Sequence, residues 1–389
     1  MFDVSDFFPS ESREQILCLM MFQESLISID SGRVDEVVEH LLQTNLIYSK
    51  DSVKQIAYNI LQAASHRPWS IKNLVSLIKK LIDNASSDNC LSILKDFLIP
   101  TDLMNQRWYR SFLLFAISQK IISAEELINL MKSYDVDEPL FLLYCWFAPI
   151  IEKSDHDIFL QLTDMLFKNK NKLSKEFQFF IDKFEQLRMN NWELQREYFL
   201  TGYYKGSLPY IIRNDNLDLL RSYFSQFNVE IDYNMKVDSS LFERCDFIRH
   251  NPTLIQFAAY YGSVKCFTYL LMQNDIDIKI TDDNGINIFQ FAIAGGNQKI
   301  IEICEKLKFE NKGIIETAIE FQRFDTMVYF IEKYKININD CDDSHLSVLH
   351  YAAKYNNVKV ILYCLKNKVD VNLKDNQVHF FVLMFLSYL

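Results

Sequence analysis

The residues best suited to metal chemistry in this 389-residue chain lie close together near its C-terminal end. Cys341, His345 and His350 are near neighbours in sequence, and Cys364 follows them. Thiolate and imidazole groups are preferred ligands of Zn²⁺, so this group is the candidate for a zinc site. However, the eight cysteines are dispersed and include no CxxC pair. This spacing favours buried, reduced thiols, and we predict no bound metal.

Three aspartates could supply oxygen ligands to a cation such as Ca²⁺. Asp282, Asp342 and Asp375 each stand at the start of a short polar stretch. The alternative is that each carboxylate accepts hydrogen bonds within its own loop, and we favour this structural role. The chain contains no phosphate-binding GxxxxGK[ST] or GxGxxG motif and no catalytic HExxH or GxSxG motif. We therefore predict a protein without a cofactor that is not an enzyme, although a Cys nucleophile with a distant His stays open.

Composition limits the fold and the partners. Only 8 Gly and 7 Pro are present, which argues against folds rich in tight turns and favours helices joined by short connections. The excess of 51 acidic over 41 basic residues gives a net charge of −10, which repels nucleic acid and anionic membranes. The N-terminus lacks the features of a signal peptide, and the apolar stretch from Phe380 to Leu389 is shorter than the roughly 20 residues that cross a bilayer. We expect a cytoplasmic protein with a protein partner, no nucleic acid and no membrane.

Residues 1–200 have the pattern of successive helices. The spacing of Val34, Val37 and Leu41 places them on one helical face. Ser123 and Glu126 form a capping-box pattern at the start of another helix. Because no strict internal period is present, we predict an all-α N-terminal region, with a helical solenoid as one option.

A period appears beyond residue 200. Four similar blocks begin at Ala258, Ala292, Ala318 and Ala352, at intervals of 34, 26 and 34 residues. Each block continues into a second apolar helix at a fixed offset. Two intervals lie within one residue of a 33-residue repeat unit, so the pattern indicates a solenoid of stacked helix pairs.

These blocks resemble the ankyrin family. The best match runs from Asp342 to Ala353 and includes a Ser347/His350 pair, where a small capping side chain precedes a polar one by three residues. Thr253 and Gln256 repeat this pair. The resemblance implies that the aspartates and His350 hold the repeat loops, and that Cys364 occupies a core position. The degeneracy and the Phe, Tyr, Asn, Ile and Lys bias resemble the large uncharacterised ankyrin families of parasitic protists.

The resemblance implies about five repeat units over residues 207–376, the first being the most decayed. We place a boundary between two helical regions at residues 190–207, and expect proteases to cut there or in the irregular stretch 233–251. Residues 377–389 are apolar where a terminal repeat is normally polar. They form either an improvised final helix or a truncated or frame-shifted end.

The resemblance also implies a binding surface. In ankyrin proteins the two positions after the alanine pair line a concave groove, and three of the four repeats carry an aromatic there. Exposed rings on a rigid concave surface are typical binding hot spots, but the rings could instead pack between repeats. The predicted partner-binding residues comprise these groove positions and the tips of the repeat loops: Tyr260, Tyr261, Glu320, Phe321, Lys354 and Tyr355 in the groove, and Asp283, Asn284, Asp343 and Ser344 at the tips.

These observations predict an all-α protein, with a helical N-terminal domain followed by an ankyrin-repeat α-solenoid, that acts as a non-enzymatic protein-interaction scaffold. Two rivals stay open. One is an enzyme or regulatory domain hidden in the N-terminal helical region, which a pocket gathering perturbed titratable groups would reveal. The other is a membrane-apposed protein that uses the apolar tail. The sequence gives no indication of the partner's identity or of an oligomeric state.

Overall fold

The computed structural model describes residues 10–100, 103–226, 232–309, 311–343, 345–371 and 373. Within these ranges the regular elements are helices, and a single antiparallel bridge joins Lys236 and Thr253. The predicted all-α class is confirmed. Two compact units are present, which we call unit 1 (residues 1–98 and 289–389) and unit 2 (residues 99–288). This division differs from the predicted boundary near residue 200, because the N-terminal helices pack with the last repeats.

Unit 1 begins with helices joined by short 3₁₀ turns. Their bounds are α1 (Ser10–Ile27), α2 (Val34–Leu42), α3 (Lys50–His66) and α4 (Ile71–Asp83). The predicted apolar face of α2 is buried at Val34, Val37 and Leu41. The Ser49 hydroxyl accepts a hydrogen bond from the Ser52 N–H at 3.0 Å and so caps the start of α3.

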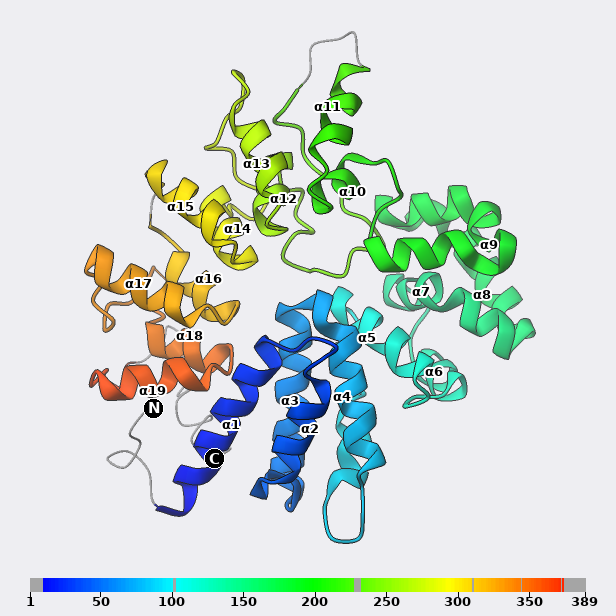
Figure 1. Cartoon of the computed structure of the whole chain (residues 1–389). Helices are drawn as coiled ribbons and strands as arrows, with labels where there is room; N and C mark the ends of the chain where they lie inside the picture. The colour runs from blue at the N-terminus through cyan, green and yellow to red at the C-terminus, as the bar shows by residue number, and fades with distance from the viewer. Residues whose placement is uncertain are drawn as a thin grey trace. The chain divides into compact units, whose positions relative to one another are not determined.

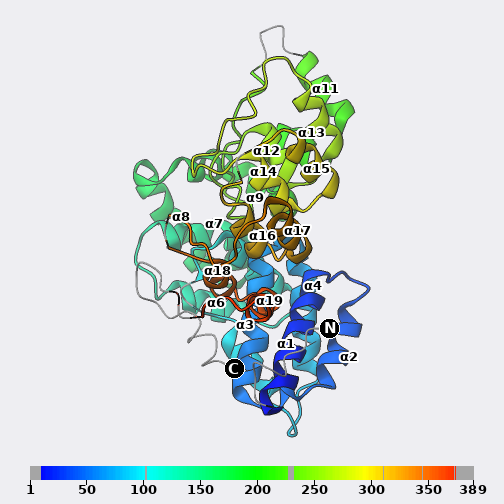
Figure 2. The same cartoon turned by 90° about the vertical axis from the view of Figure 1, so that its left-hand side faces the viewer.

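Three helix pairs complete unit 1. They are α14 (Ile288–Gly295) with α15 (Gln298–Lys306), α16 (Ile314–Glu320) with α17 (Phe324–Tyr334), and α18 (Val348–Lys354) with α19 (Val358–Lys366). Helix α1 lies beside α19, as both Figure 1 and Figure 2 show, and their contact buries Ile16 and Met20 against Val358 and Leu362. The two ends of the described chain therefore share one core.

A left-handed residue joins the helices of each pair. Gly296, Gln322 and Asn356 have φ values of 77°, 57° and 49°. At the first of these turns the Arg323 side chain leaves no room for a Cβ, which would lie 2.2 Å from its Cζ atom. The Arg323 guanidinium donates to the carbonyls of Ala294 and Gly295 at 3.0 and 2.8 Å. One side chain thus satisfies the end of α14 and links two repeats.

Unit 2 contains the central helices and the first two repeat pairs. The central helices are α5 (Arg107–Ser118), α6 (Ala124–Met131), α7 (Glu138–Ser154), α8 (His156–Asn169) and α9 (Lys175–Thr201). The repeat pairs are α10 (Leu208–Arg213) with α11 (Leu217–Ser225), and α12 (Leu254–Tyr260) with α13 (Val264–Leu271). The predicted capping box of Ser123 and Glu126 is present at the start of α6. Helix α9 is interrupted by a kink at residues 189–192, where the backbone leaves helical geometry.

Residues 232–252 are irregular, as predicted, but many of them are buried. Leu241 and Phe242 are 2% and 0% exposed, and the Trp146 indole N–H donates to the Leu241 carbonyl at 3.0 Å. The Arg107 guanidinium donates to the Ser240 carbonyl and to Glu176, both at 2.5 Å. This packing makes cleavage within residues 233–251 less favourable than at an exposed loop. Cleavage at residues 190–207 or 233–251 stays a prediction.

Candidate functional site

Paired side chains cap the inner helices of the repeats. The Thr253 N–H donates to Gln256 Oε1 at 2.7 Å, and the Gln256 N–H donates to the Thr253 hydroxyl at 3.4 Å. Ser347 and His350 form the same pair, with the Ser347 N–H 3.2 Å from His350 Nδ1. The Nε2 atom of His350 lies 3.1 Å from the Leu373 carbonyl oxygen. Both ring nitrogens of His350 are therefore engaged with the repeat itself, which is the structural role that the repeat pattern predicts.

Two of the three aspartates brace the loops that precede these helices. Asp282 Oδ1 accepts hydrogen bonds from the N–H groups of Asn284 and Ile286 at 3.0 and 2.7 Å. Asp342 Oδ1 accepts one from the Leu346 N–H at 2.9 Å. Each aspartate also donates its own N–H back across the loop, at 3.1 Å. Asp375 lies outside the described residues. The two described loops have fixed backbones, and in the described part of the chain no cluster of His, Cys, Asp or Glu side chains is arranged to hold a metal.

The residues at the tips of these loops face solvent. Asp283, Asn284 and Asp343 are exposed, whereas Ser344 lies outside the described residues. Asp283 pairs with Lys236 and accepts a hydrogen bond from the Asn251 side chain at 2.6 Å. The Lys236 and Asn251 hydrogen bonds lower the pKa of Asp283. Asp343 pairs with Lys312 at 2.7 Å. Each described tip therefore combines an exposed carboxylate with a lysine from an earlier part of its own unit.

The predicted groove residues of unit 2 lie mainly in the interior. Tyr260 is 3% exposed, and its hydroxyl lies 2.9 Å from the Cys245 sulfur. The half-buried Tyr261 donates to Glu243 Oε2 at 3.1 Å, and the Arg213 guanidinium lies 4.8 Å from the centre of its ring. Burial raises the pKa of both tyrosines. The chain's own irregular segment, which carries Glu243 and Cys245, covers these positions.

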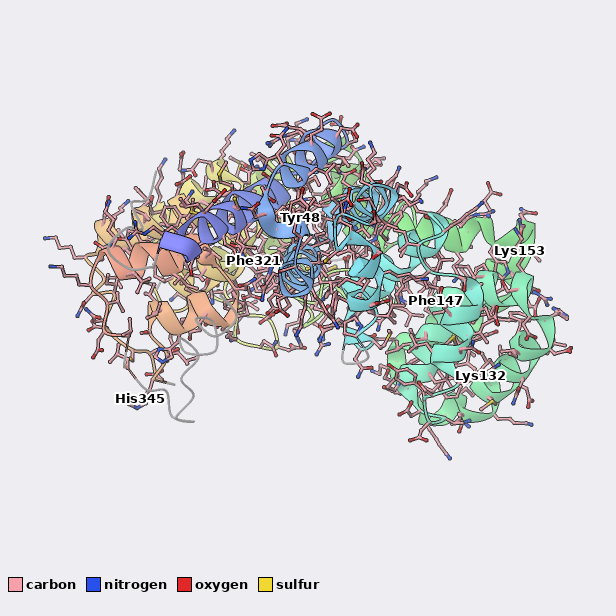
Figure 3. The ribbon with its side chains drawn as sticks, turned by 90° about the horizontal axis from the view of Figure 1, so that it is seen from below. Tyr48, Lys132, Phe147, Lys153, Phe321 and His345 are labelled. Carbon is pink, nitrogen blue, oxygen red and sulfur yellow. The ribbon has the colours of Figure 1, made fainter. Side chains whose placement is uncertain are left out.

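In unit 1 the Phe321 ring is also covered by the chain itself. It is 3% exposed, and Figure 3 shows it between the repeats and the N-terminal helices, whereas His345 lies at the outer edge. The His66 ring packs edge-on against Phe321 and Tyr355, with centroid separations of 6.1 and 6.0 Å. The prediction of exposed binding rings is therefore wrong for Tyr260 and Phe321, because segments absent from a bare repeat stack bury them.

The other groove residues of unit 1 form a polar cluster, which we call the concave cluster: Glu316, Glu320, Lys354 and Tyr355. The Tyr355 hydroxyl donates to Glu316 Oε1 at 3.1 Å, and Lys354 Nζ lies 3.5 Å from the same oxygen. Lys354 also lies 4.8 Å from the centre of the Tyr355 ring. Burial, reinforced by Glu316, raises the pKa of the half-buried Glu320 to about 7. Three predicted residues are thus brought together, with Glu316 as a member that the sequence analysis missed.

A second feature missed from the sequence is a buried carboxamide cluster formed by Gln23, Asn59 and Asn356. Gln23 Nε2 donates to the Asn356 carbonyl at 2.6 Å, and the Val358 N–H donates to Gln23 Oε1 at 3.1 Å. The Asn356 side chain donates to Asn59 Oδ1 at 3.1 Å. These residues are 4–9% exposed. The available signal was a glutamine within an apolar helix, but its partner lies 333 residues away.

The central helices contain titratable groups with shifted pKa values, which bears on a hidden enzyme. Burial lowers the pKa of Arg110 to about 10 and raises those of Tyr144 and Cys145. These three side chains are 0–2% exposed. The Arg110 guanidinium lies 3.4 Å from the carbonyls of Met104 and Asn105. Side chains enclosed in the core cannot reach a substrate, so these shifts do not favour a catalytic role.

Comparison with known proteins gives limited matches. A family model described as "Domain of unknown function (DUF3447)" matches residues 276–364. No curated protein matches the chain. Among solved structures, the chain is similar to the Bd0816 predatory endopeptidase from Bdellovibrio bacteriovorus in complex with immunity protein Bd3460. The identity is 16% and the TM-score 0.35, over 48% of this chain and 92% of that one. For the ankyrin repeat domain of Bcl-3 the identity is 16% and the TM-score 0.31, over 44% of this chain and 90% of that one.

Both structural likenesses are weak, so the class of the protein follows from its own geometry. Stacked helix pairs, aspartate-braced loops and Ser/Thr-capped inner helices define an ankyrin-like all-α repeat protein. No described helix is both long enough and apolar enough to cross a membrane.

Proposed function

We propose that this chain is a non-catalytic protein-recognition module whose partner contacts the repeat-loop tips and the concave cluster. The observation that carries the proposal is the pairing of a braced loop with an exposed tip. Asp282 and Asp342 fix the loop backbones, and the adjacent Asp283 and Asp343 face solvent. A side chain on a fixed loop loses little conformational entropy on binding, so its contacts are retained as affinity.

The concave cluster adds a second set of contacts. Lys354 is exposed, and Tyr355 and Glu320 are half-buried, so these side chains combine partial access with defined positions. A tyrosine held by Glu316 and Lys354 presents a rigid ring edge, which is a common element of binding hot spots. The rings of Tyr260 and Phe321 have no part in this surface.

The charges indicate how a partner is selected. Each described tip carries a carboxylate beside a lysine, so a matching partner surface has alternating charges rather than one sign. Exposed ion pairs each contribute about 0–1 kcal/mol, so these charges set orientation and association rate more than total affinity.

Affinity purification of the tagged full chain tests the proposal. The double variant Asp283→Lys, Asp343→Lys reverses both tips, and Glu39→Lys, Glu302→Lys makes the same change in net charge at exposed sites elsewhere. We expect the tip variant to capture at least about tenfold less partner, which corresponds to a loss of about 1.4 kcal/mol of binding free energy. The control should capture as much as the wild type. Equal capture by the wild type and both variants, with unchanged melting temperatures, contradicts recognition through the tips.

A further inference from the structure

A cleft of about 620 Å³ opens in unit 1 between α1 and the turns that join the repeat helices. One wall carries Met20, Gln23 and Ile27, which lie on one face of α1. The opposite wall contains residues from 296–298 and 322–326. Pockets for small ligands typically enclose about 300–1,000 Å³, so this cleft has room for the side chains along one face of a bound segment.

The turns along this wall repeat one geometry. Gly296, Gln322 and Asn356 each have a left-handed φ, and the next helix begins two residues later, at Gln298, Phe324 and Val358 respectively. The backbone therefore presents a similar surface at three successive repeats. The three turns share this backbone path but not their side-chain surroundings, since the Arg323 guanidinium lies against the first of them.

At the last turn the chain supplies its own occupant. The Gln23 carboxamide donates to the Asn356 carbonyl and accepts from the Val358 N–H, so one side chain bonds two backbone groups of the turn. Helix α1 thus binds a repeat turn through a carboxamide with an apolar neighbour, Met20.

The N-terminal helices make a different contact with the repeats at the preceding turn, where the His66 ring packs on Phe321. There Arg67 approaches the Phe321 carbonyl at 3.4 Å, in place of the paired carboxamide bonds. Beyond this point the cleft separates α1 from the turns at 296–298 and 322–324. The cleft therefore continues the surface that α1 already binds.

We propose that this cleft binds an amphipathic helix of a partner protein that carries a glutamine or asparagine flanked by apolar residues. The walls carry both signs of charge, from Glu24 and Asp325 and from Arg323 and Lys359, and Lys359 pairs with Glu24 at 2.5 Å. A neutral carboxamide avoids repulsion from either sign, whereas a charged side chain does not. The half-buried Ile27 and Phe324 supply apolar contacts for the flanking residues. The inference rests on the proposed function, since the ligand is a segment of a partner protein.

A phage-displayed library of random peptides about 16 residues long, enough for four helical turns, is the probe. It is selected on the full chain and on two variants of exposed positions in α15. Gln298→Trp fills the cleft, and Lys299→Trp places the same bulk on a residue that does not line it. We expect enrichment of peptides with Gln or Asn three or four residues from apolar residues. Their affinity should fall at least about tenfold on Gln298→Trp and change little on Lys299→Trp.

Three results overturn the proposal: no enrichment, equal binding to both tryptophan variants, or selected peptides without a carboxamide. A third variant, Ile16→Val, distinguishes binding in the cleft from displacement of α1, because Ile16 contacts α19 but does not line the cleft. Unchanged peptide affinity supports binding in the cleft. A severalfold rise in peptide affinity shows that the peptide displaces α1, and this result overturns the proposal. Loss of capture by the tip variant tests the proposed function separately, so either idea can fail alone.

Discussion

Replacing Phe321 with alanine removes a ring that is 3% exposed and packs against His66. Truncation of a buried phenylalanine typically costs about 3–5 kcal/mol, through lost burial and the cavity left behind. In a domain of about 200 residues, each kcal/mol lowers Tm by roughly 2–4 °C, so we expect a fall of about 6–20 °C by calorimetry or circular dichroism. Tyr48→Ala is the matched control, because this ring is 55% exposed.

The control should change the unfolding free energy by less than about 1 kcal/mol. A double-mutant cycle with His66→Ala then isolates the ring contact, for which about 0.5–1.5 kcal/mol is expected. If Phe321→Ala instead leaves Tm unchanged and weakens partner capture, the ring is an exposed binding residue and the packing argument is refuted.

Three further predictions follow from unit 1 and its loops. Burial lowers the pKa of His66 to about 4 from its ordinary 6.5. Its neutral form therefore stabilises the fold fully above pH 6.5, and this contribution is lost as pH falls to about 4. Urea titrations should show that His66→Gln loses less unfolding free energy over this pH range than the wild type does. The pKa of Glu320 is raised from 4.5 to about 7, so the unfolding free energy should decline as pH rises between these values. Glu320→Gln should therefore be more stable than the wild type at pH 8, but not below pH 4.5. Gly296→Ala should destabilise more than Gly285→Ala in thermal melts: both have positive φ, but only the first places its Cβ against Arg323. Equal losses for the two glycine variants would show that backbone strain alone sets the cost.

The helix pairs could be predicted because residues close together in the sequence determine them. Ser347 and His350, or Thr253 and Gln256, lie three residues apart, and the hydrogen bonds that they form are fixed by the geometry of a single helix start. The alanine pairs and the apolar second helices repeat at nearly constant intervals. A pattern of this kind identifies the repeat even where a turn glycine is replaced, as at Gln322, because a left-handed turn residue costs only about 1–2 kcal/mol.

The candidate site was only partly predictable. The exposure of Asp283 and Asp343 follows from their place beside a bracing aspartate. The burial of Phe321 does not, because it depends on His66, which is far away in sequence. A groove position in an isolated repeat stack faces solvent, and no property of the repeat itself signals that another part of the chain covers it.

In the contact between the N-terminal helices and the last repeats, a polar cluster fixes the position of α1 along the repeats, which the apolar residues alone do not determine. Ile16 and Met20 pack against Val358 and Leu362, and aliphatic residues of this kind tolerate sliding of one helix along another. The Gln23 carboxamide tolerates little sliding of α1, because its N–H donor and its oxygen acceptor must both meet the backbone of the turn at 356–358. A shift by one helical turn leaves buried polar groups without partners, at a cost of about 1–3 kcal/mol for each group. The carboxamide cluster therefore selects the turn at which α1 docks, and the similar turns before it keep the geometry that the proposed partner helix requires.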